Sequence, residues 1–290
     1  MQTFWAEKFA ELPPQSRILD IACGNGAICS LAAESSRDSN KEFSIAASDL
    51  ATINKDLPCD DNDRELRSVI AFHSHTPCES QPFGDNSLDF VTSQFGFEYS
   101  DVQKTLHELR RILRPDGRFV AIAHHSDSVP IKAAKEELEI YALAIDELDL
   151  LGTAARYFEA VGAVSGDSED IKKELEKHEP LATELSAGIN KLRDAWPKHA
   201  CSQFIVGAIS FIARSARQTT AAARRAAIER ATLDFKFARA RLDDMIEAAL
   251  SDEQIEGFKI DAREAGFESV HCLKLYDEDE GLVGWQIHLR

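Results

Sequence analysis

The sequence has few of the features that mark exported, membrane-spanning or disulfide-bonded proteins. Its six cysteines are scattered, with no Cys-x-x-Cys pair and no framework spacing. The longest apolar run, residues 204–213, is far shorter than the ~20 residues that a membrane-spanning helix needs. The opening residues MQTFWAEKFAEL contain no basic segment followed by an apolar one, as a signal peptide would. We therefore expect a cytoplasmic protein with reduced thiols and no membrane partner.

Basic residues are also scarce. The chain has 33 Lys and Arg against 50 Asp and Glu, so its net charge is −17. A protein this acidic repels phosphate groups, which disfavours a nucleic acid as its partner. Hydrophobic residues make up 44% of the 290 residues, which is enough for one large domain or for a core with a smaller subdomain.

The first part of the chain alternates between short apolar runs and helical patterns. The predicted strands are residues 18–22, 43–48, 68–72, 88–93 and 118–123. One helix is predicted at residues 27–35. Another begins near Ser100, which forms a capping-box pattern with Gln103, and ends at the RPDG stretch. Strands that alternate with helices indicate a parallel sheet covered on both faces.

The middle of the chain has a different pattern. Residues 131–250 are rich in strong helix formers and show almost no strand signal, and residues 131–158 are predicted to form one long helix. After them come a helix that ends at Gly266 and two apolar runs joined by the acidic stretch DEDEG, which predicts a hairpin. We therefore predict an α/β core of residues 1–130 and 251–290, interrupted by a helical insertion at residues 131–250.

A Gly-x-Gly turn follows the first predicted strand in RILDIACGNGAICSLAAE. Gly24 and Gly26 fit the dinucleotide fingerprint GxGxxG, but Cys29 stands at the third position, so the signal for NAD is weak. Asp20, at the end of the strand, would repel a pyrophosphate and suits a ligand with an ammonium group. S-adenosylmethionine (SAM) has an ammonium group, a sulfonium and no phosphate, and the glycines let the backbone approach its methionine portion.

A second acid, Asp49, ends the second predicted strand in AASDL. A carboxylate there can accept hydrogen bonds from both hydroxyls of a ribose, as it does in NAD sites. Asp49 therefore indicates a ribose, and Asp20 together with the glycine turn favours SAM over NAD as the cofactor.

Four stretches of the chain resemble the motifs of a known family. ILDIACGNGA, SDL, PFGDNSLDFV and LHELRRILRPDGRFVAI are similar, in order and spacing, to motifs of the class I SAM-dependent methyltransferases, near the small-molecule ubiquinone and menaquinone branch. The resemblance covers residues 17–125 and the terminal hairpin. It implies a Rossmann-like, seven-stranded sheet with an antiparallel last strand. It also implies SAM at the carboxyl ends of the first strands, methyl transfer, and S-adenosylhomocysteine as the product.

The resemblance also assigns the cofactor contacts. They are Asp20, Ala22, Gly24, Asn25, Gly26, Asp49, Leu50, Gln94 and Phe95. The family has an acid for the adenine amino group in a GDAxxLPF-like stretch, whereas this chain reads FHSHTPCESQPF and matches it only at residues 81–83. Ser74, His75 or Thr76 is therefore expected to contact the adenine through its side chain or its backbone.

The candidates for chemistry follow the fourth and fifth predicted strands. Methyl transfer is an in-line displacement whose leaving group, a neutral thioether, needs no acid, so a base is required only for an acceptor that arrives protonated. QFGFEYS, residues 94–100, supplies an aromatic wall and an acid, and AIAHHSDS, residues 121–128, supplies two histidines. The catalytic candidates are Glu98, Tyr99, His124 and His125.

Each candidate has a structural alternative. The aromatic residues can belong to the core, Glu98 can cap a helix or lie in solvent, and the histidines can be a structural pair. Neighbouring strand residues point to opposite faces, so only one of His124 and His125 is expected to face the pocket. A metal held by the two histidines and Asp127 is not expected, because no HxxxH or CxxC pattern supports it.

The helical insertion follows the fifth predicted strand and is expected to cap the acceptor pocket, as such insertions do in the family. Residues 136–184 are mostly acidic and residues 214–241 are rich in Arg, which favours two solvated helix faces that pair with each other. Arg224 is a candidate for holding an anionic substrate. The long apolar stripe is a candidate interface for a homodimer.

The sequence therefore predicts a SAM-dependent methyltransferase that transfers the methyl group to O, N or C of a small-molecule acceptor in a capped pocket. Two alternatives stay open, a SAM-binding or protein-interaction module without methylation and a protein methyltransferase. An RNA substrate is disfavoured by the charge and by the lack of an Asn/Asp-Pro-Pro-aromatic motif after the fourth strand.

Overall fold

A computed structural model of the chain describes residues 1–54, 61–162, 172–173, 176–215 and 220–290. Contacts between Cα atoms divide the chain into two units. The sheet unit contains Met1–Ile131 and Glu247–Arg290, and the helical unit is Lys132–Ile246. Each unit has its own buried apolar core. The sequence analysis expected the insertion to begin at residue 131 and to end at residue 250.

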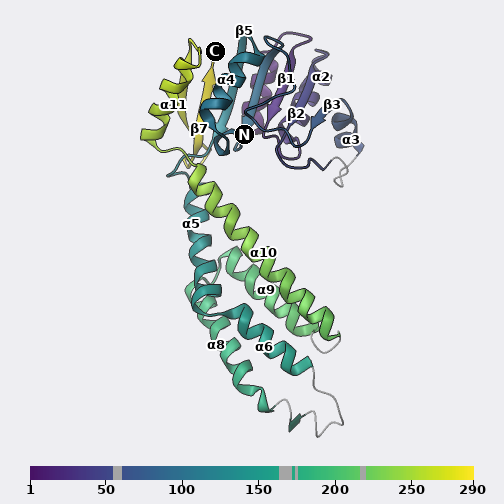
Figure 1. The fold of residues 1–290 in the computed structure, drawn as a ribbon, viewed down its shortest axis with the longest axis vertical. Coiled ribbons are helices and arrows are strands. Elements are labelled where there is room, and N and C mark those ends of the chain that lie inside the picture. The colour runs from purple at the N-terminus through teal and green to yellow at the C-terminus, as the bar shows by residue number, and fades with distance from the viewer. Residues whose placement is uncertain (55–60, 163–171, 174–175, 216–219) are drawn as a thin grey trace. The chain divides into compact units, whose positions relative to one another are not determined.

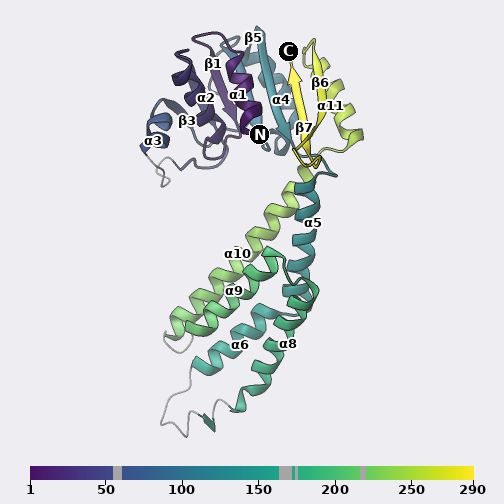
Figure 2. The ribbon, with the colours of Figure 1, turned by 180° about the vertical axis from the view of Figure 1, so that it is seen from behind.

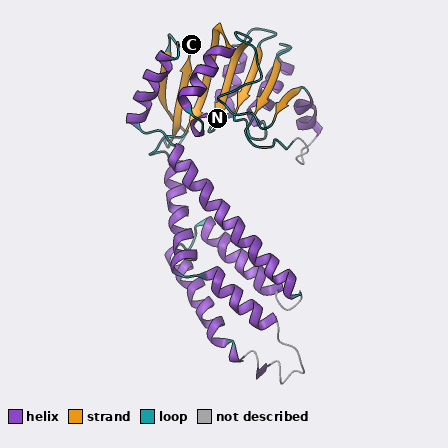
Figure 3. Cartoon of the chain, in the orientation of Figure 1, coloured by secondary structure: helices purple, strands orange, loops and turns teal. Residues whose placement is uncertain are grey.

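The sheet unit is built on one seven-stranded sheet (Figures 1 and 3). Its strands are β1 (Arg17–Ile21), β2 (Ser44–Ser48), β3 (Ile70–His73), β4 (Leu88–Gln94), β5 (Leu113–Ala123), β6 (Val270–Tyr276) and β7 (Leu282–Leu289), in the order β3-β2-β1-β4-β5-β7-β6. Neighbours from β3 to β5 are parallel, and β7 is antiparallel to β5 and β6. The predicted Rossmann-like sheet with an antiparallel last strand is confirmed. The strand order reverses between β1 and β4, and ligands of such sheets bind beside the carboxyl ends of the strands at that point.

Helices cover both faces of this sheet (Figures 1 and 2). Figure 2 shows α1 (Gln2–Ala10) and α2 (Ala27–Asp38) on one face, and α3 (Asp61–Ser68) contacts α2. Figure 1 shows α4 (Val102–Ile112) and α11 (Asp252–Glu264) on the other. Apolar side chains at helical spacing, such as Leu106 and Leu109 of α4, pack in the core between the sheet and the helices.

The start of α4 differs from the prediction. Asp101, and not Ser100, is the N-cap, because its Oδ1 accepts a hydrogen bond from the backbone N–H of Lys104 at 3.2 Å. The hydroxyl of Ser100 donates instead to the carbonyl of Phe97 at 2.6 Å and closes the short 3₁₀ helix η1 (Phe97–Tyr99). The capping-box interpretation was therefore wrong by one residue, since two polar side chains in succession compete for the free N–H groups.

Two further boundaries differ. Strand β5 begins at Leu113 and not at residue 118, because Leu113 already pairs with Leu88 and the register then shifts before Arg118 pairs with Phe90. The helix predicted at residues 131–158 is not continuous. It consists of α5 (Val129–Tyr141), the wide π-helical turn η2 (Ala142–Glu147) and α6 (Leu150–Gly162), and Asp149 between the last two has φ of 43°.

The helical unit consists of the greater part of α5, η2, α6, α8 (Glu179–Ala195), α9 (Ala200–Ser215) and most of α10 (Ala221–Ala248). Phe158, Leu192, Ile205 and Phe235 lie at its centre and are almost fully buried. Ion pairs join α10 to neighbouring segments, with Arg239 and Asp146 at 2.9 Å. None of the described helices combines the length and the apolar character that crossing a membrane requires.

Candidate functional site

The turn between β1 and α2 has a backbone that only glycine adopts easily. Gly26 has φ of 83°, and a Cβ atom there would lie 2.8 Å from the ring of Phe72. A Cβ atom at Gly24, which has φ of 54°, would meet no protein atom within 4 Å, so this side of the turn is open to a ligand. The turn therefore packs on the protein at one glycine and offers free space at the other.

Asp49 joins the loop after β2 to this turn. Its Oδ2 accepts a hydrogen bond from the N–H of Gly24 at 2.7 Å, and its Oδ1 accepts one from the N–H of Ala51 at 2.8 Å. Each carboxylate oxygen has two lone pairs, so both can accept a further hydrogen bond from a hydroxyl group. The residue therefore fits the two hydroxyls of a ribose.

Asp20 lies beneath the same turn and is almost fully buried. Its Oδ1 accepts a hydrogen bond from the hydroxyl of Thr92 in β4 at 2.8 Å. Burial raises the pKa of Asp20 to about 7; the Thr92 hydrogen bond opposes this and the charge of Asp49 adds to it. A buried carboxylate without a positive partner is costly, so this position fits the ammonium group of SAM.

Arg67 of α3 contacts both loops that form the turn region. Its Nη1 donates to the carbonyl of Asn25 at 2.5 Å and its Nη2 donates to the carbonyl of Asn54 at 3.0 Å. The guanidinium lies 5.1 Å from the ring centroid of Phe72, the residue that packs against Gly26. Arg67 thus fixes the turn from outside, and no motif in the sequence indicated it.

The expected adenine edge, after β3, is bonded to the loop after β2. The hydroxyl of Ser74 accepts from the N–H of Ile53 at 3.0 Å, and the ring of His75 lies 3.3 Å from the hydroxyl of Thr52. The N–H of Thr76 donates to the carbonyl of Asp49 at 2.9 Å. These side chains position the loops, and Leu50 on the same loop has an exposed apolar side chain.

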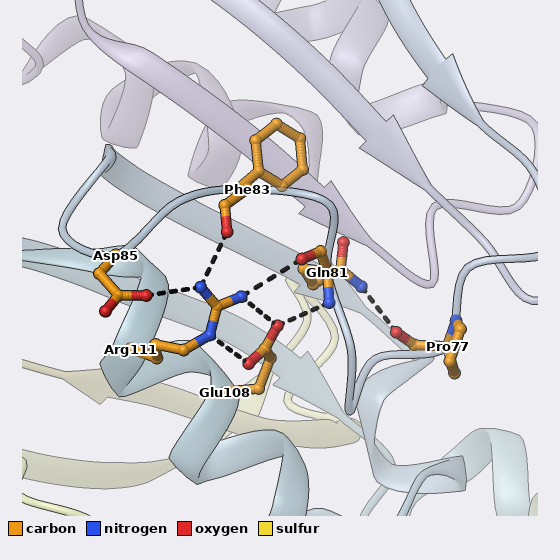
Figure 4. Close-up of polar contacts among 6 residues, drawn as sticks. All are labelled: Pro77, Gln81, Phe83, Asp85, Glu108 and Arg111. Carbon is orange, nitrogen blue, oxygen red and sulfur yellow. Dashed lines mark hydrogen bonds and ion pairs between the residues drawn. The ribbon is translucent and has the colours of Figure 1, made fainter.

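The later part of the loop after β3, residues 81–85, is held by Arg111 of α4 (Figure 4). Its guanidinium donates to the carbonyls of Phe83 and Gln81 at 2.8 and 3.2 Å, and to Glu108 through Nε and Nη2 at 2.7 and 2.6 Å. Figure 4 also shows its contact with Asp85, at 2.8 Å. Burial acts to raise the pKa of Glu108, but the hydrogen bonds from Arg111 and from the N–H of Gln81 hold it below its ordinary value.

The end of β4 lies directly against the glycine turn. A Cβ atom at Gly96 would be 2.6 Å from Cβ of Ala22, so only glycine permits this approach. Gln94, two residues earlier, accepts a hydrogen bond at 2.6 Å from the indole N–H of Trp5 in α1. Gln94 and Trp5 also line a cavity of about 670 Å³, together with Asn25 of the turn and Arg67.

Glu98 and His124 meet at the carboxyl ends of β4 and β5. Oε1 of Glu98 accepts the backbone N–H of His124 at 2.9 Å and lies 2.8 Å from its Nδ1. The ring of His124 lies against Phe95, with centroids 4.4 Å apart, and near Tyr99, at 6.1 Å. Three of the four catalytic candidates are therefore in contact with one another.

His125 is separate from this group. Its ring stacks on Trp285 of β7 at 4.8 Å, and its Nδ1 accepts from the N–H of Asp127 at 3.0 Å. Burial, together with the charge of Lys274, lowers the pKa of His125, and Asp252 opposes this. Within the described part of the chain, no group of three or more His, Cys, Asp or Glu side chains is arranged as metal ligands would be.

The sheet unit resembles known methyltransferases in sequence. A family profile described as a methyltransferase domain matches residues 19–121. The ubiquinone/menaquinone biosynthesis C-methyltransferase UbiE of Rickettsia felis is 31% identical over 126 residues, which are 42% of this chain and 50% of that protein. The protein of the same name from Rickettsia prowazekii is 33% identical over 132 residues, with the same coverage. Residues 19–121 therefore match a methyltransferase domain, as the resemblance to the class I SAM-dependent family predicted.

The match to this methyltransferase domain confirms the predicted family and identifies SAM as the cofactor. The chain spans about half the length of the curated relatives that it matches. Among solved structures, the geranyl diphosphate C-methyltransferase from Streptomyces coelicolor A3(2) is 18% identical, with a TM-score of 0.34 over 42% of this chain and 44% of that one. That likeness is too low to support a conclusion.

The individual site residues stay predictions, but the structure shows how the methyltransferase domain groups them. Asp20, Ala22, Gly24, Asn25, Gly26, Asp49 and Leu50 lie at the ends of β1 and β2 or in the loops that follow, and Gln94 and Phe95 lie at the end of β4. Ser74 and His75 contact the loop after β2. Sequence reasoning missed Arg67, Glu108 and Arg111. The Glu-x-x-Arg spacing in ELRR, residues 108–111, was a usable signal for the pair, because it places both side chains on one helix face.

Proposed function

We propose that this chain is an enzyme that transfers the methyl group of SAM to a small-molecule acceptor. The observation that supports this most is Asp49, whose two carboxylate oxygens accept N–H groups of the glycine turn and of its own loop while keeping lone pairs for a ribose. Asp49 accepts from Gly24, and the side of the turn at Gly24 has no protein atom near it. A carboxylate with only a structural role would not need such open space beside it.

SAM supplies an electrophilic methyl group on a positively charged sulfur. The chain's residues bind and orient it. Asp20 accepts the ammonium group, Asp49 the ribose hydroxyls, and the loop after β3 borders the adenine. The Arg67 and Arg111 networks keep these loops in place, so the methyl group is presented in one direction, which is the main contribution to in-line transfer.

The cavity of about 670 Å³ beside Gln94 and Asn25 borders the glycine turn, but its lining does not include His124, so we place the acceptor at the ends of β4 and β5 and not in this cavity. Its lining combines apolar side chains, such as Trp5 and Leu31, with the charged Glu34 and Arg67. The names of the Rickettsia relatives, C-methyltransferases of quinone biosynthesis, also support a small organic acceptor. In this proposal the methyl group is transferred to O, N or C of the acceptor.

We further propose that the helical insertion covers the acceptor. The chain segments before and after the insertion run side by side within the sheet unit. The N–H of Leu250 donates to the carbonyl of His124 at 2.9 Å, and the N–H of Ser126 donates to the carbonyl of Leu250 at 3.2 Å. The two segments of the sheet unit that connect to the insertion are therefore hydrogen-bonded to each other at His124. A cover of this kind would exclude water from the reacting groups.

We propose a homodimer through α10, but not through the apolar stripe that the sequence suggested, because Phe235 of that stripe is buried in the core of the helical unit and Ile228 and Leu242 pack against this core. Residues 222, 226, 229, 233, 237, 240 and 244 of this helix are all exposed and follow one another at steps of three or four residues. Leu233 and Phe237 in this row are 48% and 56% exposed. Leu233 lies close to the middle of the helix, so a second α10 can cross it antiparallel about a two-fold axis.

The charges of α10 favour this antiparallel arrangement. Arg225 and Arg230 lie in its first half, and Asp243, Asp244 and Glu247 lie in its last two turns. In an antiparallel pair the basic end of one helix faces the acidic end of the other. A parallel pair would place like charges together.

The test of the proposed function is calorimetric titration of the chain with SAM and with S-adenosylhomocysteine, followed by a screen of phenolic, carboxylic and amine acceptors for methyl transfer. Micromolar binding and transfer to a small acceptor would support the proposal. Binding without any transfer would favour a SAM-binding module, and transfer only to basic peptides would favour a protein methyltransferase. Absence of binding would contradict all three.

A further inference from the structure

The ends of β4 and β5 bring together an acid and an imidazole that cofactor binding does not use. We propose that Glu98 and His124 remove a proton from the methyl acceptor, and that this acceptor is a phenol. The proposal rests on the proposed methyltransferase function and adds the class of substrate to it. His124 is the catalytic residue, and Glu98 is the residue that positions it.

The contact with Glu98 decides which nitrogen of His124 is available. A carboxylate only accepts hydrogen bonds, so Nδ1, 2.8 Å from Oε1, bears the proton of the neutral ring. Nε2 then has the lone pair that a base needs. The same Oε1 accepts the backbone N–H of His124 at 2.9 Å, so the carboxylate fixes both the ring and the chain that holds it.

The free nitrogen is placed where a reacting group can reach it. Nε2 of His124 makes no hydrogen bond to the described residues. It also does not belong to the fully buried polar atoms that lack a partner, so it is not completely enclosed. The side chain of Glu98 is 0% exposed and that of His124 is 7% exposed. The imidazole of His124 is therefore the part of the pair that an acceptor can contact.

The pair also lies close to the cofactor turn. Phe95, which packs on His124, directly precedes Gly96, which approaches Ala22 at the end of β1. Only β4 separates β1 from β5 in the sheet. Adjacent strands are about 4.8 Å apart, so the ends of β1 and β5 are about 10 Å apart, a span that a cofactor and a small acceptor fill.

The surroundings of the ring favour a phenol over other acceptors. Phe95 and Tyr99 pack on the imidazole with interplanar angles of 33° and 84°, so an acceptor at Nε2 would meet aromatic side chains, on which another aromatic ring packs well. A phenol, with a pKa of about 10, arrives protonated at neutral pH and needs a base. A carboxylic acid arrives ionised and needs no base, and a phenol, as the stronger acid, gives its proton to an imidazole more readily than an alkyl alcohol does.

The proton and the electrons balance without another reactant. The phenol O–H bond breaks, and its proton moves to Nε2 of His124. The phenolic oxygen bonds to the methyl carbon while the carbon–sulfur bond breaks, and the electron pair of that bond stays on sulfur. The products are a methyl ether, S-adenosylhomocysteine and an imidazolium, which returns its proton to water.

The experiment measures ionisation of a bound phenol and does not depend on turnover. 4-Nitrophenol is titrated into the full chain saturated with S-adenosylhomocysteine, at a pH below the pKa of the phenol, and the absorption band of the phenolate is followed. We expect the unmodified chain to ionise the bound phenol. We expect His124→Gln to abolish the band and Glu98→Gln, which keeps the acceptor oxygen without its charge, to weaken it several-fold.

The matched control is His107→Gln, because His107 is an exposed histidine on α4 outside the site. It should give the band of the unmodified chain. Circular dichroism checks that each variant folds, and Glu98→Gln decides the question if His124→Gln does not. In turnover of a phenolic acceptor, His124→Gln should lower kcat by about 100-fold, the lower end of what general bases contribute, and leave KM for SAM unchanged.

The outcomes separate this inference from the function on which it rests. A band that is lost in His124→Gln, with S-adenosylhomocysteine still bound, supports the pair. An equal band in all variants, or no band in an unmodified chain that binds S-adenosylhomocysteine, overturns it. Failure of the unmodified chain to bind S-adenosylhomocysteine overturns the methyltransferase function itself.

Discussion

The sheet unit and the helical unit differ in the ionisable side chains that they bury. Among the described residues, the buried ionisable side chains of the sheet unit include Asp20, Glu98, His124 and His125, whereas in the helical unit the buried charged residue is Arg224. The helical unit exposes large apolar side chains on α9 and α10, namely Phe204, Phe211, Leu233 and Phe237. The sheet unit also exposes large apolar side chains, such as Leu50 and Leu273, so the two units differ mainly in the ionisable side chains that they bury.

The difference follows from what each kind of backbone offers. Burial of a charge costs several kcal/mol unless hydrogen bonds or an opposite charge compensate. Turns at the carboxyl ends of parallel strands have free N–H groups, such as those of Gly24 and His124, that can bind a carboxylate. A helix uses its own N–H groups, apart from those at its ends. We therefore expect methyl transfer in the sheet unit and propose self-association through the helical unit.

The largest expected effect tests the chemical side of this comparison. Asp49→Ala removes the proposed ribose contacts and the acceptor for two backbone N–H groups. Hydrogen bonds to a charged group contribute about 1.5–3 kcal/mol, so the affinity for SAM should fall by about 100-fold. Calorimetric titration measures this, with Asp49→Asn as the conservative variant. Unchanged affinity in a folded variant would contradict the ribose assignment.

The second effect tests the association side. Leu233→Glu places a charge at the centre of the proposed two-fold interface and should raise the dimer dissociation constant by more than about 10-fold. Analytical ultracentrifugation measures this, and Glu229→Gln on the same exposed row is the milder control. The affinity for SAM should stay the same. If the unmodified chain is a monomer, the proposed dimer is ruled out. If Leu233→Glu lowers the affinity for SAM, association and cofactor binding are not divided between the two units.

A third effect is the dependence of cofactor binding on pH. Burial raises the pKa of Asp20 to about 7 in the free protein, so the carboxyl is neutral below that pH and cannot pair with an ammonium group. The affinity for SAM should fall by up to about 10-fold per pH unit as the pH drops from 7 to 5, and Asp20→Asn should bind weakly with a flatter profile.

The same shift affects stability in the opposite sense. Unfolded Asp20 ionises near its ordinary pKa of 3.8 while the folded group holds its proton up to about 7, so its contribution lowers the free energy of unfolding as the pH rises between these values. Chemical unfolding of the unmodified chain and of Asp20→Asn over this range measures the difference. A SAM affinity with the same slope in both proteins would exclude Asp20 as the titrating group.

A fourth effect concerns the loop after β3. Arg111→Lys keeps the charge but cannot form the forked contacts with Glu108 and the carbonyls of Phe83 and Gln81 (Figure 4). We expect a several-fold loss of SAM affinity, because the loop that borders the adenine is less well fixed. Arg110→Lys, on the same helix, is the matched control. Equal affinities in both variants would limit Arg111 to a structural role.

The smallest expected effect is that of Trp5→Phe. The change removes the hydrogen bond from the indole N–H to Gln94 at 2.6 Å and keeps an aromatic ring in the core. The free energy of unfolding should fall by about 1 kcal/mol. Urea unfolding measures this. A loss of several kcal/mol would mean that packing, and not the hydrogen bond, gives Trp5 its importance.

Much of the sheet unit followed from the sequence, because its signals are local. The apolar runs that became β1, β2 and β4 end within one residue of their predicted ends. The errors occurred where neighbouring groups compete, as at Ser100 and Asp101, or where the register of a distant strand decides, as at Leu113. No periodicity could have placed the break after Tyr141, since η2 continues the helical pattern with a wider turn.

The candidate site divides in the same way. Motif spacing by itself determined the strand, the glycine turn and the helix that follows it, and it predicted the role of Asp49, because a tight glycine turn between a strand and a helix constrains a few consecutive residues. Only the tertiary structure showed that His124 contacts Glu98 while His125 stacks on Trp285, and only it joined Arg67 to Asn25 and Arg111 to the loop of Gln81. Adjacent residues on a strand face opposite sides of the sheet, so their partners come from elements far away in the sequence, and no local pattern records them.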